Sequence, residues 1–365
     1  MRRFIVAGII VLTAASGLLF SEELPRDISD TEFWRLITEF SEPGGTFPQQ
    51  YMSNEDSAQF VIPTLKETPQ RSGAYLGVGL EQNFTYIAAI QPKIAFIIDI
   101  RRDNMIEHLV YKALFELSPD RADFVSRLFS RKRPAGLTTN SSVQAIFDAY
   151  QSLPADPGVF EDNQRAVIKQ LAIEHKLPLD EADRAAVTRV LNAFRVSSPA
   201  TLRGQGDNTN PTYSQLMTAT DLNGRNQSYL ASEDTFKMLK EFEKRNLIVP
   251  LVGDFAGSKA IASVGKYLKD RNATVDVFYL SNVERYLFEQ NDDAKRFYGN
   301  VGALPLGPSS IFIRSVTSDI SRRLGIPIPD SPAKWRSFLS PIRDNLKAFD
   351  AGNLQSYTDI FKISR

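Results

Sequence analysis

Two short apolar segments on either side of a helical segment constrain the fold of this chain most. Ala74–Gly79 and Ile94–Ile100 lack the alternation of apolar and polar residues that a half-exposed strand shows. Continuous apolar runs of this length are typical of parallel strands that are buried on both faces. Between them, Phe84, Ile87 and Ala88 fall on one side of a helix. The sequence therefore predicts a strand–helix–strand unit with parallel strands.

The same pattern returns in the second half of the chain. Leu247–Val252 and Thr274–Leu280 are predicted strands with an amphipathic helix between them, and Ser309–Thr317 can supply another strand. Between the two strand-rich parts, periodic apolar residues predict a long helical stretch. We therefore expect an α/β fold with one doubly wound, mostly parallel, Rossmann-like sheet. A single domain over 28–365 would carry a helical insertion, about 104–230, after its second strand.

Composition excludes several kinds of site. The chain of 365 residues has no cysteine, which rules out a disulfide framework, a zinc–thiolate site and an iron–sulfur cluster. Its two histidines, His108 and His175, leave little from which to build a Ser-His-Asp triad or a multi-histidine metal site. Basic and acidic side chains number 43 each, and this balance argues against nucleic acid as a partner. We therefore expect metal-free chemistry with a small-molecule cofactor.

The N-terminus has the plan of an export signal. Arg2 and Arg3 precede an uncharged apolar run from Phe4 to Phe20. Residues 1–20 are therefore expected to be a signal peptide or an uncleaved membrane anchor, with the folded part exported to the cell envelope. Any membrane contact would be made through this segment alone. The alternative is a buried N-terminal helix in a cytoplasmic protein.

The turn after the first predicted strand is the main candidate site. Gly77 and Gly79 allow a ligand to approach the backbone closely, and the next helix points its free N–H groups at the same place. Asp99 lies twenty residues after Gly79, at the end of the neighbouring strand, where a carboxylate can accept hydrogen bonds from ribose hydroxyls. The candidate cofactor-binding residues of this unit are Gly77, Gly79, Glu81, Gln82, Asn83, Asp99 and Arg101.

The pattern departs from a dinucleotide-binding fingerprint. It reads G-x-G-x-x-Q, with Gln82 where that fingerprint has its third glycine, and Glu81 would repel a pyrophosphate at the start of the helix. A cofactor with a positive or zwitterionic group is favoured, which indicates S-adenosylmethionine over NAD or FAD. The alternative is a strand, a turn and a second strand in an ordinary α/β core.

Two later strands end in polar residues at the same expected edge. Asp254 could meet an adenine amino group and Phe255 could cover the ring, although Asp254 could equally cap the following helix. Ser281 and Asn282 follow the next strand, and Ser281 could likewise be a helix cap. The candidate catalytic residues are Asn282 and Glu284, which would orient or deprotonate an acceptor.

In chain order, these motifs resemble the nucleotide-binding motifs of class I S-adenosylmethionine-dependent methyltransferases. The chain is more closely similar to an uncharacterised bacterial family with a methyltransferase-like fold, of which leptospiral members are known. The segments that carry this resemblance are "EFSEPGGTF", "SNE", "GVGLEQNFTYIAAIQPKIAFIIDIRRDN", "LASEDTF" and "VGDFAGSKAIASVGKYLKDRNATVDVFYLSNVERYLF". The resemblance implies that fold, S-adenosylmethionine as cofactor, and a position of Asn54 and Glu55, in the SNE loop, over the cofactor.

We therefore expect an S-adenosylmethionine-binding, methyltransferase-like protein with an unknown methyl acceptor. Such a reaction needs little acid–base chemistry, because the sulfonium is already activated and the protein mainly aligns the reacting groups. The alternative is a non-catalytic cell-envelope binding or scaffolding module that keeps the fold, which the export signal favours because the methyl donor is made in the cytosol. A nicotinamide oxidoreductase is a third hypothesis, weakened by Gln82.

Overall fold

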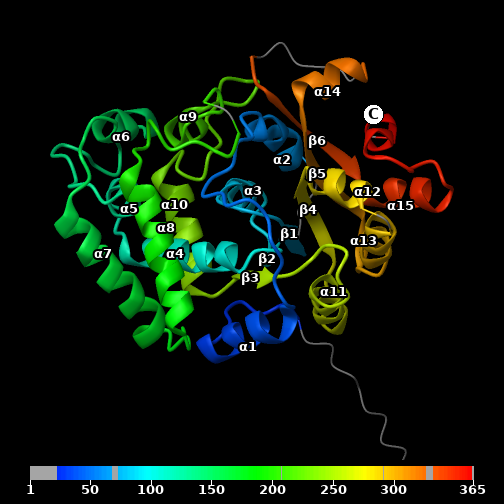
Figure 1. The fold of residues 1–365 in the computed structure, drawn as a ribbon, viewed down its shortest axis with the longest axis horizontal. Coiled ribbons are helices and arrows are strands. Elements are labelled where there is room, and N and C mark those ends of the chain that lie inside the picture. Colours follow the sequence, from blue (N-terminus) through cyan, green and yellow to red (C-terminus); the bar gives the residue numbers. More distant parts are fainter. Residues whose placement is uncertain (1–22, 68–72, 207, 291, 326–331, 364–365) are drawn as a thin grey trace, which may run out of the picture.

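A six-stranded sheet in the order β3-β2-β1-β4-β5-β6 forms the centre of the protein (Figure 1). The structure is a computed structural model that describes residues 23–67, 73–206, 208–290, 292–325 and 332–363. The strands are β1 (Ala74–Gly77), β2 (Ile94–Asp99), β3 (Ile248–Val252), β4 (Val275–Ser281), β5 (Leu306–Thr317) and β6 (Trp335–Pro341). The first five are parallel and β6 runs antiparallel to β5. The predicted α/β fold with a mostly parallel sheet is therefore confirmed, and it is compatible with a Rossmann-like fold.

The strand order reverses between β1 and β4, which both pair with neighbours in parallel register. Leu76 of β1 lies opposite Phe96 of β2 on one side and Phe278 of β4 on the other. Every residue of β1, β2 and β3 is buried, which explains why the sequence shows no polar alternation there. In an open α/β sheet, ligands bind at the carboxyl ends of the strands beside such a reversal.

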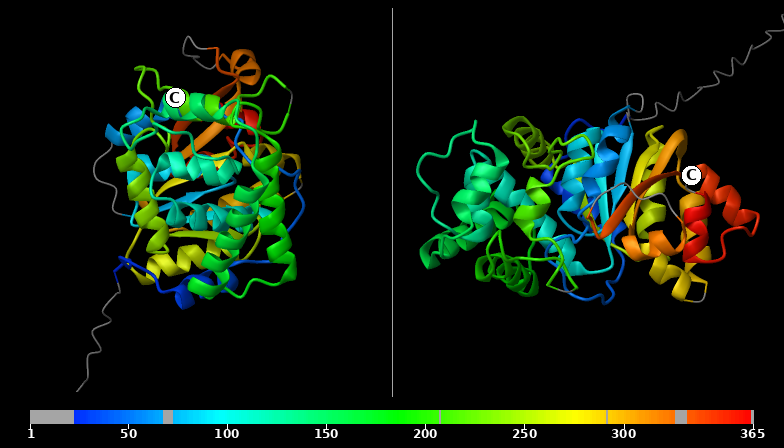
Figure 2. Two further views of the ribbon diagram at one scale, coloured as in Figure 1. Left: turned by 90° about the vertical axis from the view of Figure 1, so that its left-hand side faces the viewer. Right: turned by 90° about the horizontal axis from the view of Figure 1, so that it is seen from above.

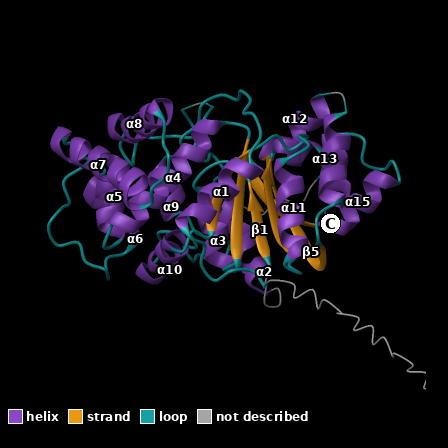
Figure 3. Cartoon of the chain, turned by 90° about the horizontal axis from the view of Figure 1, so that it is seen from below, coloured by secondary structure: helices purple, strands orange, loops and turns teal. Residues whose placement is uncertain are grey.

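Helices cover both faces of the sheet (Figure 3). One face carries α3 (Gln82–Ile90), α4 (Arg102–Leu117) and α10 (Glu233–Lys244), and the other carries α1 (Asp30–Phe40), α11 (Ala260–Asp270), α13 (Asp293–Gly302) and α15 (Ile342–Asp350). Phe278 and Tyr279 are consecutive in β4, so their side chains point to opposite faces. Because Phe278 packs against Phe297 of α13 and Tyr279 against Tyr86 of α3, these two helices lie on opposite faces.

A block of helices connects β2 to β3 and lies to one side of the sheet (Figure 2). Besides α4 and α10 it contains α5 (Arg121–Phe129), α6 (Val143–Tyr150), α7 (Pro157–Lys169), the π-helix η2 (Gln170–Glu174), α8 (Glu181–Val196) and α9 (Tyr213–Thr218). Aromatic rings join this block to α3, because Phe84 of α3 packs against Phe115 of α4 and against Tyr229. Phe115 in turn packs against Phe236 of α10.

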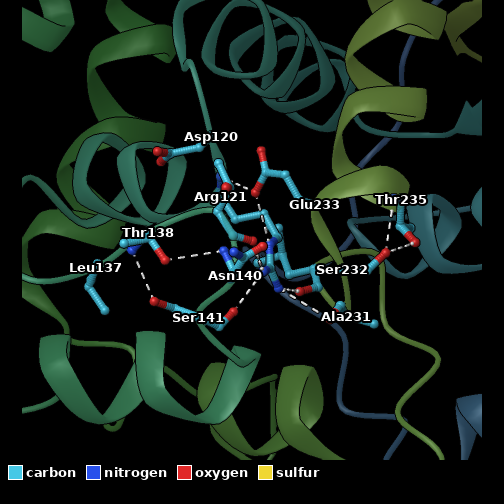
Figure 4. A network of polar contacts seen from close by, with 12 residues as sticks. Asp120, Arg121, Leu137, Thr138, Asn140, Ser141, Ala231, Ser232, Glu233 and Thr235 are labelled. Carbon is cyan, nitrogen blue, oxygen red and sulfur yellow. Dashed lines mark hydrogen bonds and ion pairs between the residues drawn. The ribbon is translucent and has the colours of Figure 1, made fainter.

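A buried arginine fixes three segments of this block to one another (Figure 4). The guanidinium of Arg121 donates to the carbonyl of Leu230 at 2.9 Å and to that of Ser141 at 2.7 Å. Its Nε lies 3.2 Å from a carboxylate oxygen of Glu233 in the first turn of α10. The arginine thereby links the start of α5, the loop before α6 and the start of α10.

The remaining elements pack against β5, β6 and the helices α3, α13 and α15. They are η1 (Ala58–Val61), α2 (Ile62–Glu67), α12 (Val283–Glu289), α14 (Ser318–Arg323), η3 (Tyr357–Asp359) and α16 (Ile360–Ile363). The predicted export segment, residues 1–20, lies outside the described residues. Within the part of the chain that is described, no helix is both long and apolar enough to cross a membrane.

Candidate functional site

The turn between β1 and α3 leaves space beside Gly79. This glycine has a φ of +75°, a conformation that L side chains rarely adopt, and no other atom lies within 4 Å of the place where a Cβ would be. Gly79 is partly exposed, whereas its neighbours Val78 and Leu80 are buried. A ligand atom can therefore approach the backbone here, as the sequence predicted for this position.

The other predicted glycine has a structural role instead. A Cβ on Gly77 would lie 1.9 Å from Oδ1 of Asn83 and 2.7 Å from the ring of Tyr75, so the space that this glycine leaves is filled. The Asn83 side chain accepts from the Tyr75 hydroxyl and donates to the carbonyls of Val78 and Leu80 at 2.8, 2.9 and 2.7 Å. The prediction that Gly77 and Asn83 contact a cofactor is therefore wrong in this conformation, because each is used to hold the turn.

The acid at the end of β2 is paired with the neighbouring arginine. Oδ1 of Asp99 accepts from the backbone N–H and the Nε of Arg101 at 2.9 and 3.1 Å, and Oδ2 accepts from a terminal nitrogen at 3.2 Å. Both side chains are 6% exposed. The same guanidinium also donates to the carbonyl of Gln50 and to Oδ1 of Asn104. Ribose hydroxyls could reach the Asp99 carboxylate only if Arg101 withdrew from it.

Glu81 lies at the start of α3 with its carboxylate completely buried. Both carboxylate oxygens accept from the backbone N–H of Ser53, at 3.1 and 3.0 Å. Burial raises the pKa of Glu81 to about 8, although the hydrogen bond from Ser53 opposes this shift. The carboxyl group is therefore largely protonated at neutral pH, and the helix start lacks the negative charge that the sequence suggested.

A stripe of polar groups on α4 faces this turn. Asn104, Glu107, His108 and Tyr111 are spaced three and four residues apart, so they share one side of the helix, and we call them the α4 stripe. Nε2 of His108 lies 2.7 Å from the carbonyl oxygen of Gly79, which docks the stripe onto the turn. Burial lowers the pKa of His108 to about 4, so the neutral imidazole donates its Nε2 proton to Gly79.

The α4 stripe contains several buried polar atoms that lack a partner. Among the described residues, no hydrogen bond is made by either carboxylate oxygen of Glu107, by Nδ2 of Asn104, by Nδ1 of His108 or by the hydroxyl of Tyr111. The same is true of Nε2 of Gln82 in the first turn of α3. All five side chains are at most 4% exposed. Unpartnered buried polar groups are rare in folded proteins, because each costs free energy of about 1–3 kcal/mol.

Among these unpartnered side chains, Glu107 has the least favourable free energy of burial. Burial raises its pKa well above the usual value, and the nearby Glu81 carboxyl raises it further. The charges facing it are those of Glu81, Arg101, Asp99 and Asp103, and only that of Arg101 lowers its pKa. The carboxyl groups of Glu81 and Glu107 therefore influence one another, and Arg101 is the charge that opposes this effect.

A second buried carboxyl lies at the end of β4. Glu55 accepts hydrogen bonds from the hydroxyls of Ser281 and Ser315, and burial still raises the pKa of Glu55. Ser281 has a φ of 51°, an unusual value for a residue with a side chain. Asn54 donates to the carbonyl of Gln205 at 3.1 Å, so the SNE loop is attached to the loop before α9. The loop lies beside Glu81 and Ser281.

Asp254 makes a contact within its own turn, and Phe255 is part of the core. Oδ1 of Asp254 accepts from the backbone N–H of Ala256 at 2.9 Å, a contact within the turn before α11. Phe255 is 4% exposed and its ring packs against those of Phe278 and Phe297, with centroid distances of 5.6 and 5.9 Å. The prediction that Phe255 covers an adenine is therefore corrected, because the ring belongs to the core between the sheet and α13.

The predicted proton acceptor is fully engaged elsewhere. The carboxylate of Glu284 is bound by Nε of Arg314 at 2.5 Å, by a terminal nitrogen of Arg314 at 2.8 Å and by the hydroxyl of Tyr298. Both members of the ion pair are 2% exposed. The role of Glu284 as a catalytic base is corrected for this reason, whereas Asn282, the N-cap residue of α12, is partly exposed.

The structure thus gathers one part of the predicted site and separates another. Gly79, Glu81, Gln82, Asp99 and Arg101 lie around the turn after β1, and we call these five residues the turn site. Sequence reasoning missed the α4 stripe and Ser53. Two surface hollows, of about 250 and 350 Å³, lie away from the turn site, one between α11 and α13 and one at the amino ends of the strands.

Comparison with known proteins identifies a family without a described activity. Residues 51–351 match the family model described as "Domain of unknown function (DUF7790)". This match includes the whole sheet, the turn site and the α4 stripe. No functionally curated protein matches the chain.

Proposed function

The chain belongs to the DUF7790 family, and we propose that it is an S-adenosylmethionine-binding, methyltransferase-like protein whose ligand lies at the turn site. The observation that carries the proposal is the space beside Gly79, in the turn after β1, together with the buried Asp99 at the end of the neighbouring strand β2. Both positions are at the carboxyl ends of strands beside the reversal of strand order, where α/β proteins of this topology bind nucleotides. The methyl acceptor is unassigned.

The kinds of side chain around the turn site favour a sulfonium derivative of adenosine over a dinucleotide. A pyrophosphate would need several donors without nearby acids, whereas Glu81, Asp99 and Glu107 all approach this turn. Arg101 is the only basic residue among those facing Glu107, and it is already paired with Asp99. A positively charged sulfonium compound would meet carboxyl groups here instead of a phosphate-binding cradle.

Arg101 is the residue that would have to move for an adenosine to bind. In this conformation its guanidinium covers the two oxygens of Asp99 that a ribose would use. The arginine also contacts the carbonyl of Gln50, just before the SNE loop, so its movement would be coupled to that loop. S-adenosylmethionine supplies an already activated methyl group when bound, so the residues of this site need only bind and orient.

A binding protein without methyl transfer is the second candidate function. It is favoured by the surroundings of Glu284, whose carboxylate is held by Arg314 and Tyr298 in the core and is not exposed to a substrate. A ligand-binding module of the cell envelope would keep the turn site and need no catalytic base.

Isothermal titration calorimetry of the full chain with S-adenosylmethionine, S-adenosylhomocysteine and NAD tests the proposal. We expect heat with the first two and none with NAD. Asp99→Asn should weaken binding about 10- to 100-fold, since it removes charge-assisted hydrogen bonds to the ribose. Asp276→Asn is the matched control, because Asp276 accepts from Gly73 at the opposite, amino edge of the sheet.

Each result separates the hypotheses. A response to NAD alone, or no heat with any adenosine compound, would contradict the proposal. Binding of S-adenosylmethionine without formation of S-adenosylhomocysteine during incubation with cell-envelope extracts would favour the binding module.

A further inference from the structure

Buried acids without a partner require a physical reason for their presence. Glu107 is 1% exposed and neither of its oxygens makes a hydrogen bond, although a glutamine or an apolar residue would fit the same helix at lower cost. Glu81 lies beside it at 0% exposure. Such an arrangement is destabilising in the empty protein and becomes favourable when a cation lies between the two carboxylates.

We propose that Glu81 and Glu107 form a binding subsite for an organic ammonium group. The ammonium belongs either to the bound adenosine cofactor or to an amine that accepts the methyl group. The cofactor case rests on the function proposed above, whereas the amine case does not.

Independent contacts support a ligand at this place. Nε2 of Gln82 and Nδ2 of Asn104 are unpartnered donors, each at least nine-tenths buried, on the two helices that carry the acids. The open side of Gly79 lies beside them, because Nε2 of His108 ties the α4 stripe to the carbonyl of Gly79 at 2.7 Å. The unpartnered groups therefore lie on the two helices that meet at Gly79, which is the one partly exposed residue of the turn between Val78 and Gln82.

The geometry points to an organic cation and not to a metal ion. Among the described residues, no group of three or more histidine or acidic side chains is placed to hold a metal. Two carboxyl groups suit an ammonium once they lose their protons, because an ammonium needs a few acceptors and no fixed coordination number. The free amide N–H groups of Gln82 and Asn104 suit an acceptor atom of the same ligand. Aromatic groups also line this side, because Tyr111 follows Glu107 by one turn of α4.

The SNE loop controls access to the subsite. The backbone N–H of Ser53 binds both oxygens of Glu81, and Asn54 holds the loop to Gln205. Gly204 fits closely beneath it, since a Cβ there would lie 2.6 Å from that of Asn54. A cation that reaches Glu81 must therefore displace Ser53 or bind on the Gly79 side of the carboxylate.

The test compares Glu107→Gln with Glu243→Gln in the full chain. Glu243 is the matched control, because it is also buried with a raised pKa but lies on α10 near Lys112, away from the turn. The probes are S-adenosylmethionine, 5′-methylthioadenosine, which has the nucleoside without a cation, and ethylammonium as a simple amine. Affinities for the nucleosides are measured by calorimetry and for ethylammonium by ligand-observed NMR.

The two sources of the ammonium give different results. If the cofactor carries it, Glu107→Gln weakens S-adenosylmethionine about 10- to 100-fold, leaves 5′-methylthioadenosine within about twofold, and Glu243→Gln changes neither. If the acceptor carries it, only ethylammonium binding is lost. Binding of a cation should also release roughly one proton at pH 7, measured as a dependence of the heat on buffer ionisation, and this release should fall in Glu107→Gln.

Unchanged affinity for all three probes in Glu107→Gln would overturn the proposal. Should that variant fold poorly, Glu81→Gln tests the same subsite from α3 and is expected to weaken the same probe. If no adenosine compound binds the wild-type protein while ethylammonium binds and requires Glu107, the proposed function fails and the ammonium subsite stands.

Discussion

Two buried carboxylates of this protein have opposite surroundings. Glu284 and Glu107 are 2% and 1% exposed. Glu107 lies on α4, which packs against β2 and β3, and Glu284 lies on α12, which packs against α13. Glu284 is held by two nitrogens of Arg314 and the hydroxyl of Tyr298, and the rest of that guanidinium is satisfied by Ser340 and Asn345. Glu107 has no hydrogen-bond partner among the described residues.

The difference distinguishes a buried acid that stabilises the fold, Glu284, from a buried acid that we propose binds a ligand, Glu107. The Arg121 network is another satisfied case, since all three guanidinium nitrogens find carbonyl or carboxylate partners (Figure 4). Removing one member of such a network leaves a buried charge unpaired. Replacing Glu107 removes the unfavourable free energy of burying an acid without a hydrogen-bond partner. Proteins retain such destabilising groups mainly at functional sites.

We expect the largest loss of stability when the ion pair between Arg314 and Glu284 is broken. Arg314→Met leaves the Glu284 carboxylate buried without its partner, and we expect the free energy of unfolding to fall by about 3–5 kcal/mol in urea titrations. Arg165→Met is the control, because its ion pair with Asp162 is two-thirds or more exposed and should contribute at most about 1 kcal/mol. Equal effects of the two substitutions would remove the distinction between the regions.

The buried acid at the start of α3 should make the stability depend on pH. The pKa of Glu81 is raised to about 8, so the folded protein keeps a proton that the unfolded chain releases above its ordinary value of 4.5. Stability from this group is full below about pH 4.5 and is lost as pH rises toward 8, on the order of 1 kcal/mol for each pH unit. Glu81→Gln should flatten the decline measured by urea unfolding from pH 5 to pH 8. Glu39→Gln, at an exposed position, should leave the slope unchanged.

The third prediction reverses the usual effect of a core substitution. Glu107→Met replaces an unpartnered acid with an apolar chain of similar length, and we expect a gain of about 1–2 kcal/mol in the free energy of unfolding at pH 7. Glu284→Met, the same change at the satisfied position, should be destabilising. A loss of stability in both variants would show that Glu107 has a structural role.

The sheet could be predicted from the sequence because its inner strands are buried on both faces. Leu247–Val252 and the strands around it are continuous apolar runs, which leave little ambiguity about their state. The strand Trp335–Pro341 was missed, because it lies at the edge of the sheet and only two of its residues are buried. Nothing in this short segment of mixed polar and apolar residues indicates that it pairs with Leu306–Thr317.

The site was only partly predictable, for a different reason. Gly79 and Asp99 follow a local spacing rule, so their positions could be read from the chain. Glu107 could not, because α4 is buried on nearly all sides and its polar stripe is concealed among apolar residues. The pairing of Glu284 joins residues thirty positions apart, and only the folded arrangement of α12 and β5 brings Arg314 to it. Spacing rules describe local backbone turns. The partners of a buried charge come from distant parts of the chain and depend on the tertiary structure.

We expect the smallest loss of stability from a substitution in the cluster around His175, whose polar groups have hydrogen-bond partners but are only partly buried. His175 bridges Asp30 of α1 and Glu116 of α4, with contacts of 2.7 and 2.6 Å. Burial lowers the pKa of His175, but the hydrogen bond and charge of Glu116 outweigh it and the net pKa is raised. The stabilisation is therefore full below about pH 6.5 and is lost as pH rises through the raised pKa of the folded state. Relative to the wild type, His175→Gln should lose about 0.5–1.5 kcal/mol at pH 5.5 and less at pH 8.5, measured by urea unfolding. A loss that grows with pH would mean that the neutral imidazole makes these contacts, and the cluster would then resemble the α4 stripe more than the Arg314 pair.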